Sequence, residues 1–167
     1  MLRPALLLAT VLSIVGLAVA GGVATAAVNC DKKGKEGKWC TLPNRTSFQV
    51  TKGENDEFNI SKYRGKAQLD FRSSCANQRR GRFKIKGPLK VGVSYEFDKV
   101  TKVPTERVVV TYTVRLTAKI VSAKKAVVKG TVNAHQPAIP PSGSESGEDE
   151  LRLDCKVNRT LKRVLGD

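Results

Sequence analysis

An alternation of side chains between residues 107 and 134 constrains the fold of this chain more than any other feature. In its first part, apolar residues recur at every second position, and polar or basic residues stand between them. The apolar positions are Val108, Val110, Tyr112, Val114, Leu116, Ala118 and Ile120. After a short turn at 122–125, the apolar pattern resumes at Ala126, Val128, Gly130, Val132 and Ala134. A period of two in β-branched residues predicts a long β-hairpin with one apolar face and one polar, basic face.

A lone hairpin is marginally stable in water, so other strands must cover its apolar face. Shorter alternating segments, separated by turn residues, lie at 46–51, 58–60, 67–72, 82–86, 91–97 and 151–157. About eight strands with closely spaced turns predict an all-β fold, with an antiparallel β-sandwich as first choice and a β-barrel as second. No helical period is present outside the N-terminal segment.

The first 27 residues have the pattern of an N-terminal signal helix. Arg3 supplies a positive start, residues 5–20 are apolar, and Ala24-Thr25-Ala26 fits a cleavage site. We therefore expect cleavage near residue 27, a secreted or envelope-associated location, and no membrane contact afterwards. Retention as an anchor is the alternative, because the uncharged stretch 5–28 is long enough to cross about 30 Å of hydrocarbon.

Four cysteines follow the signal, and an even count in a secreted chain predicts two disulfides with three possible pairings. We favour Cys30–Cys40, which closes a small loop rich in glycine and lysine. The second bond is then Cys75–Cys155, which ties the end of a central strand to the last strand. Zinc binding is disfavoured, because no pair of cysteines has the short spacing of a zinc site.

The chain after the signal divides into a disulfide-closed basic segment at 28–45 and one β-sandwich domain at 46–167. Within this domain, residues 135–150 are acidic and rich in proline, serine and glycine, which predicts a mobile loop. His135, the one histidine, lies in this loop, where no scaffold holds it for catalysis.

The chain contains none of the familiar motifs of serine hydrolases, zinc proteases or P-loop proteins. Glu54, Asp56 and Glu57 lie close together, but the spacing of a calcium loop is missing, so we expect a polar turn. The sequence therefore predicts no enzyme activity, no cofactor and no metal. A secreted hydrolase-like enzyme that uses carboxylate chemistry is the alternative.

The charge of the chain favours anionic partners. Arg3 is the only charged residue before residue 28, so the rest carries a formal net charge of +14, from 29 basic and 15 acidic residues. Such a charge attracts polyanions through a long-range, salt-sensitive field. The candidate anion-binding residues are Arg79, Arg80, Arg82, Lys84 and Lys86.

In this cluster, positions 82, 84 and 86 share one strand face. Arg115, Lys119 and Lys129 occupy outward positions of the long hairpin and extend the cluster into a stripe if the strands share a sheet. An idle basic surface that maintains solubility is the alternative. Nucleic acid is not the expected partner, because the outward face offers neither interleaved aromatics nor a groove-binding helix.

Part of the chain resembles a known group of proteins. The segments LDFRSSC, RGRFKIKG and LTAKIVSAKKAVVKGTVNA, followed by a late cysteine, are similar to small secreted actinobacterial β-proteins of unknown function. The resemblance covers roughly residues 48–164, with residues 126–132 standing for the recurring A-x-G-T strand. It implies a secreted β-sandwich in which Cys75 and Cys155 are bonded, and it implies no activity.

These features predict a secreted, non-enzymatic binding or structural module of the cell envelope or exterior. Its basic surface is expected to contact an anionic cell-wall polymer or an extracellular protein. A secreted protein inhibitor that presents the basic loop 75–82 is a further alternative. The sequence leaves the oligomeric state open.

Overall fold

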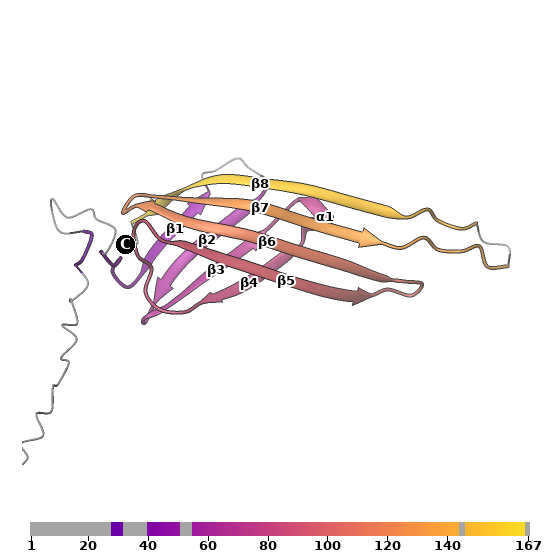
Figure 1. Cartoon of the computed structure of the whole chain (residues 1–167), viewed down its shortest axis with the longest axis horizontal. Coiled ribbons are helices and arrows are strands. Elements are labelled where there is room, and N and C mark those ends of the chain that lie inside the picture. The colour runs from indigo at the N-terminus through magenta and orange to yellow at the C-terminus, as the bar shows by residue number, and fades with distance from the viewer. Residues whose placement is uncertain (1–27, 32–39, 51–54, 144–145, 166–167) are drawn as a thin grey trace, which may run out of the picture.

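The structure, a computed structural model, describes residues 28–31, 40–50, 55–143 and 146–165 (Figure 1). The predicted signal at 1–27 and the lysine-rich tip at 32–39 lie outside these residues. The elements are β1 (Thr46–Val50), β2 (Glu57–Tyr63), β3 (Lys66–Arg72), α1 (Cys75–Gln78), β4 (Arg80–Ile85), β5 (Ser94–Pro104), β6 (Val109–Ser122), β7 (Lys125–Gln136) and β8 (Leu151–Val164). Among the described residues, no helix is long and apolar enough to cross a membrane.

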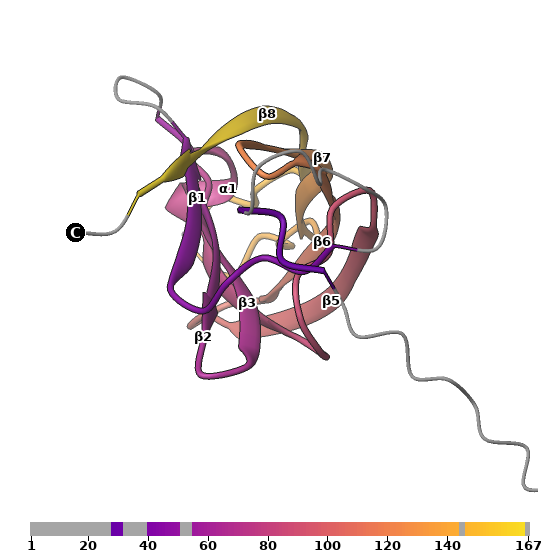
Figure 2. The ribbon, with the colours of Figure 1, turned by 90° about the vertical axis from the view of Figure 1, so that its left-hand side faces the viewer.

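All eight strands belong to one antiparallel sheet, in the order β4-β3-β2-β1-β8-β7-β6-β5. The first strand pairs with the last, so the two groups β1–β4 and β5–β8 join into a single sheet. This sheet curls into a nearly closed barrel, seen end-on in Figure 2. The predicted all-β, antiparallel fold of about eight strands is confirmed, and the single curled sheet gives it the barrel-like arrangement.

A row of aromatic rings closes the seam between the two edge strands, β4 and β5. Phe58, Phe71, Phe83 and Phe97 follow one another across four strands, with ring centroids 6.2, 5.9 and 5.2 Å apart. The last of these contacts joins β4 to β5. Offset and tilted rings at such distances attract one another in addition to the area that they bury. Side-chain packing therefore closes the barrel where the strand pairing ends.

The long hairpin predicted from residues 107–134 is present as β6 and β7. Its predicted inward set is buried at Val114, Leu116 and Ala118, which confirms the alternation. Gly130 has a φ of 145°, and a Cβ at this position would lie 1.9 Å from the carbonyl oxygen of Arg115. Only glycine therefore lets β7 approach β6 at this point.

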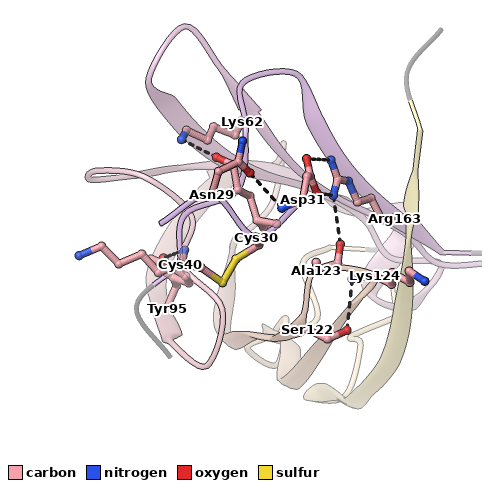
Figure 3. The surroundings of a disulfide bond; sticks show 12 residues. Asn29, Cys30, Asp31, Cys40, Lys62, Tyr95, Ser122, Ala123, Lys124 and Arg163 are labelled. Atoms are coloured by element: carbon pink, nitrogen blue, oxygen red, sulfur yellow. Dashed lines mark hydrogen bonds and ion pairs between the residues drawn. A yellow bond between two sulfur atoms is a disulfide. The ribbon is translucent and has the colours of Figure 1, made fainter. Parts of the chain in front are cut away.

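The barrel has a closed end, where chain without regular secondary structure covers the core. Leu42, Leu89 and Ile120 are almost fully buried there. The backbone nitrogen of Leu42 donates to the carbonyl of Leu89 at 3.0 Å, and that of Gly92 donates to the carbonyl of Ile120 at 2.7 Å. The Cys30–Cys40 disulfide lies at this end (Figure 3). The second disulfide is Cys75–Cys155, so the structure contains the pairing that the sequence favours.

The opposite end is open, because β5–β8 extend well past the shorter β1–β4 (Figure 1). The hairpin of β7 and β8 continues past Gln136, since Ile139 and Glu148 exchange backbone hydrogen bonds of 2.8 and 2.9 Å. Part of the predicted loop at 135–150 is thus a paired extension of this hairpin. The mobility of this loop stays a prediction.

Candidate anion-binding surface

The five basic residues singled out in the sequence lie on and beside the edge strand β4. Arg79 is the C-cap residue of α1, and Lys86 follows β4 directly. The other three, Arg80, Arg82 and Lys84, belong to β4. Arg82, Lys84 and Lys86 are exposed, whereas Ile85 between the last two is buried. This confirms that the basic positions of this strand face outward.

Arg82 is held by an acidic partner on the neighbouring strand. Its Nε donates to Asp70 Oδ1 at 2.6 Å, because Asp70 lies directly opposite it in the β3–β4 register. Gln68 Nε2 donates to the other carboxylate oxygen at 2.7 Å. The hydrogen bond and the negative charge of Asp70 raise the pKa of Arg82. The positive charge of Arg82 is thus largely balanced within the sheet.

Arg79 lies away from the outward face of β4. Its guanidinium carbon stands 4.7 Å from the ring centroid of Tyr112, in the geometry of a cation–π contact. Tyr112 belongs to the inward set of β6 and packs against the core. The five candidates therefore do not form one surface. Three of them are exposed and have no ion-pair partner among the described residues: Arg80, Lys84 and Lys86.

A larger group of unpaired cations lies on the outward face of β6, β7 and β8. We call it the lysine face, and it consists of Lys119, Lys125, Lys129, Lys156 and Lys162. All five side chains are exposed, and none has an ion-pair partner among the residues that the structure describes. Polar residues such as Thr117, Thr131 and Asn158 stand between them. Val127 and the acid Asp154 also point outward on these strands, and Asp154 lies two residues from Lys156. The lysine face is therefore a mainly polar surface with an excess of positive charge.

The strand register sets the spacing of these charges. Lys125 lies directly opposite Lys162, so two like charges share one cross-strand position. Thr131 is opposite Lys156 and Asn158 is opposite Lys129, which makes Lys129 and Lys156 diagonal neighbours. Directly opposite side chains start about 5 Å apart and diagonal ones about 7–8 Å, so these charges repel one another.

Acidic residues mark the limits of the lysine face. Arg115, which also points outward from β6, forms an ion pair of 3.4 Å with Asp98 on β5. Asp98 and Glu96 are both exposed on β5, between the lysine face and the cations of β4. The basic residues therefore form two separate groups on the barrel instead of the single stripe that the sequence allowed.

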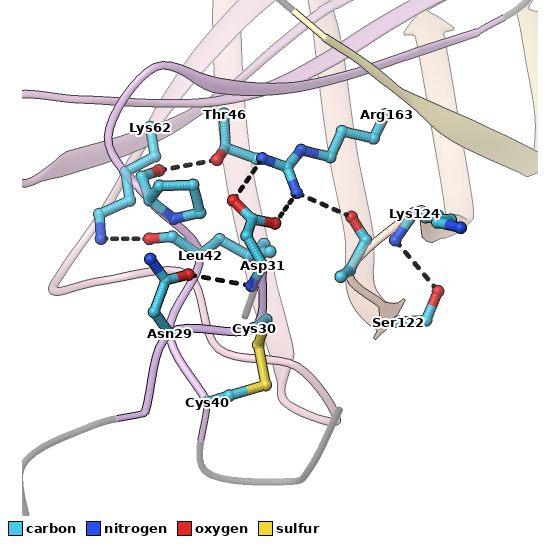
Figure 4. Close-up of polar contacts among 12 residues, drawn as sticks. Asn29, Cys30, Asp31, Cys40, Leu42, Thr46, Lys62, Ser122, Lys124 and Arg163 are labelled. Atoms are coloured by element: carbon cyan, nitrogen blue, oxygen red, sulfur yellow. Dashed lines mark hydrogen bonds and ion pairs between the residues drawn. A yellow bond between two sulfur atoms is a disulfide. The ribbon is translucent and has the colours of Figure 1, made fainter. Parts of the chain in front are cut away.

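Three further cations point inward and hold parts of the fold together. Arg159 donates to Asp56 Oδ2 at 3.0 Å, and Arg163 forms a two-pronged ion pair with Asp31. Lys62 Nζ donates to the carbonyl oxygen of Leu42 at 2.8 Å (Figure 4). Burial lowers the pKa of Lys62. Each of these contacts joins residues that are far apart in the sequence, so the sequence alone does not reveal them.

Asp56 is a buried structural carboxylate, a role that the sequence did not reveal. It accepts hydrogen bonds from the backbone nitrogen of Ser74 at 2.8 Å and from the Ser74 hydroxyl at 2.9 Å. Burial raises the pKa of Asp56, but these bonds and the charge of Arg159 outweigh burial, and the net pKa is lowered. Asp56 therefore stays ionised and joins the start of β2 to the segment before α1.

His135 belongs to an exposed cluster on the β7–β8 hairpin. Its Nε2 lies 2.6 Å from Glu150 Oε1, which also accepts a hydrogen bond of 2.7 Å from Arg152 Nε. Hydrogen bonds from Arg152 and His135 lower the pKa of Glu150. Within the described ranges, no three histidine, cysteine or acidic side chains gather in a way that could hold a metal ion.

Comparison with protein-family models, curated proteins and solved structures finds no match to this chain. The resemblance to small secreted actinobacterial β-proteins therefore stays a prediction. Two disulfides are typical of proteins that fold in an oxidising compartment.

Proposed function

We propose that this protein is a secreted, non-enzymatic binding module of the cell envelope or exterior, and that the lysine face attaches it to an anionic cell-wall polymer. The observation that carries this proposal is the group of five exposed, unpaired lysines on three neighbouring strands. The oxidised cysteines and the signal-like N-terminus support secretion.

The energetics of the lysine face support a binding role. Like charges directly opposite each other destabilise a sheet, as at Lys125 and Lys162. A surface on which lysines alternate with acidic residues would also keep the protein soluble, but without this repulsion. Solubility alone therefore does not explain why two lysines face each other. An anionic polymer laid across the strands removes the repulsion and releases its own condensed counterions, so binding gains from both effects.

The chemistry of the lysine face favours repeated, separated anionic groups. Lysine is a compact point charge on a flexible stem, whereas arginine forms a planar fork for one carboxylate or phosphate. The polar residues between the lysines offer hydroxyl and amide groups for hydrogen bonds to a hydrated polymer. The polar residues between the lysines include no aromatic side chain on which a nucleic-acid base could stack.

The test is retention of the purified protein by cell-wall sacculi from its host. Two variants remove the same charge from different places: Lys129, Lys156 and Lys162 to Gln on the lysine face, and Arg80, Lys84 and Lys86 to Gln beside β4. Each lowers the net charge by three, so they differ only in location. All six side chains are exposed, and replacing such residues changes stability by less than about 0.5 kcal/mol.

We expect strong retention at about 0.01 M salt and little at about 1 M, because the screening length falls from about 30 Å to about 3 Å. The lysine-face variant should lose most of the retention at low salt, and the β4 variant should keep most of it. Equal losses would assign retention to net charge alone. Retention that changes neither with the salt concentration nor with the lysine-face substitutions would overturn the proposal.

A further inference from the structure

The strand register places three members of the lysine face on one straight line. Lys119 on β6 lies opposite Val127, and Lys129 stands two residues further along β7, toward the open end. Lys129 in turn lies opposite Asn158, and Lys156 stands two residues from it on β8, again toward the open end. The three lysines therefore follow a diagonal across three neighbouring strands (Figure 1), and we call them the lysine row.

The lysine row has a regular spacing. Diagonal neighbours on one face of a sheet lie about 7–8 Å apart, so the row carries three positive charges along about 15 Å. The positions directly opposite its lysines hold uncharged residues, which are Ser94, Thr117, Val127, Thr131 and Asn158. An extended anionic chain can therefore meet the three charges one after another, with hydroxyl and amide groups beside its path.

The two sides of the lysine row differ in charge. Glu96 and Asp154 are exposed beside its first and last lysine, and both stand on the side of the open end. Lys125 and Lys162 lie on the side of the closed end. A polyanion is therefore repelled on one side and attracted on the other, which confines an extended chain to the row and the lysines beside it.

We propose that the polymer bound by the lysine face is a linear polyol phosphate, a chain of phosphodiesters joined by short polyols, and that it runs along the lysine row. This inference rests on the proposed function of the lysine face. A repeat with a three-carbon polyol has six backbone bonds, twice the three of a peptide residue, and so spans about 7 Å when extended. Successive phosphates therefore match successive lysines of the row.

The chemistry of the row also favours phosphodiesters over carboxylates. Successive side chains of an extended acidic peptide point to opposite sides, so half of its charges face away from the surface that it lies on. A phosphodiester chain carries its charge in the backbone, where every phosphate can meet the surface. The ammonium group of lysine is a point charge with three rotatable donors, and it needs no planar partner.

The experiment is a calorimetric titration of the purified protein, with both disulfides intact, at about 0.01 M salt, where charges are screened least. The probe is a glycerol phosphate oligomer with four phosphates, which spans about 21 Å and is long enough to follow the row. A capped tetraglutamate with four carboxylates and a thymidine oligomer with four phosphates are the comparison ligands.

We expect saturable binding of the glycerol phosphate oligomer at one site per chain. Tetraglutamate should bind at least about tenfold more weakly, because fewer of its charges contact the row and release counterions. The thymidine oligomer should bind no more tightly than the probe, because its bases find no aromatic side chain on which to stack.

Two variants remove the same charge from different parts of the lysine face. The row variant combines Lys119→Gln with Lys156→Gln, and the off-row variant combines Lys125→Gln with Lys162→Gln. All four side chains are exposed, so both variants are expected to fold like the parent. The row variant should weaken binding of the probe at least about tenfold more than the off-row variant does, because the row lysines contact the phosphates.

A third variant changes the spacing and leaves the net charge unchanged. Lys129→Thr combined with Thr131→Lys moves the middle charge off the line, to the position directly opposite Lys156. We expect about a tenfold loss of affinity for the probe, because one phosphate contact is lost. Unchanged affinity would show that total charge, and not the spacing of the row, decides binding, and it would overturn the inference.

The outcomes separate this inference from the proposed function. Equal losses in the row and off-row variants would overturn the lysine row and leave the lysine face as the site of attachment. Binding that neither variant weakens would overturn both. Tetraglutamate that binds as tightly as the probe would assign the face to carboxylate polymers, and a thymidine oligomer that binds more tightly would assign it to nucleic acid; either result would overturn the polyol phosphate.

Discussion

At the closed end of the barrel, Leu42, Leu89 and Ile120 are almost fully buried, whereas at the open end Leu151 is half exposed and Tyr112 only half-buried. Both ends are built by the same inward alternation of strand residues. The difference is what lies over them: two segments without regular secondary structure cover one end, and no described segment covers the outermost row at the other. An alternating pattern therefore predicts which side chains share a face, but connecting segments decide whether that face is buried.

The largest expected contrast comes from the two disulfides. Cys75–Cys155 closes a separation of 80 residues, and Cys30–Cys40 closes one of 10. Replacing both cysteines of the first pair by serine should lower the free energy of unfolding by about 4–5 kcal/mol. The same replacement in the second pair should lower it by about 2–3 kcal/mol, because the shorter loop loses less entropy on closure. Urea denaturation of both variants measures this difference. A larger loss from the short loop would show that the N-terminal segment holds the fold more strongly than the long-range bond.

Two leucine truncations test the difference between the closed and the open end at single residues. Leu42→Ala at the closed end should cost about 3 kcal/mol of unfolding free energy, because Leu42 is 1% exposed and its removal leaves a cavity. Leu151→Ala at the open end should cost less than about 1 kcal/mol. Thermal and urea unfolding of the two variants provide the measurement. Similar losses at both sites would mean that the inward side chains at the open end of the barrel are covered in solution.

The smallest expected effect is a pH dependence at the closed end. A hydrogen bond from Arg163 and its positive charge lower the pKa of Asp31 despite some burial. The folded state therefore releases this proton more readily than the unfolded state, whose aspartate pKa is about 3.9. The stabilisation is fully present above that pH and is lost as the pH falls through the lower, folded pKa.

Asp31→Asn should accordingly reduce the loss of stability between about pH 5 and about pH 2. Asp98→Asn is the control, because the Asp98–Arg115 ion pair is largely exposed and such pairs contribute little. Denaturant titrations across this pH range measure the slopes of both variants. An unchanged slope in Asp31→Asn would show that the pair with Arg163 does not persist in solution.

The all-β fold could be predicted because alternation is a local property of the sequence. The burial of residues in β2, β3 and the second half of β6 follows it closely. The seam could not be predicted, since it depends on Phe83 and Phe97 meeting between strands that do not pair. The segments that cover the closed end could not be predicted either, because Leu89 lies in a segment whose apolar residues do not alternate regularly.

The candidate surface was harder to predict than the fold. Outward positions follow from alternation, so Lys84, Lys119 and Lys129 could be placed correctly. Partners across strands depend on register, which the sequence does not reveal, and the ion pair of Arg82 with Asp70 was therefore missed. The same limit hid the lysines of β8, which join the lysine face only because β8 pairs with β7.

The salt dependence of binding to a purified, soluble anionic wall polymer is the decisive measurement for the lysine face. A plot of log affinity against log salt concentration has a slope that counts the released counterions, at about 0.7–0.9 for each lysine in contact. We predict that replacing Lys129, Lys156 and Lys162 by Gln reduces this slope by about two to three, whereas the Arg80, Lys84 and Lys86 variant keeps the slope of the parent. An unchanged slope in the lysine-face variant would contradict the proposed role of these lysines.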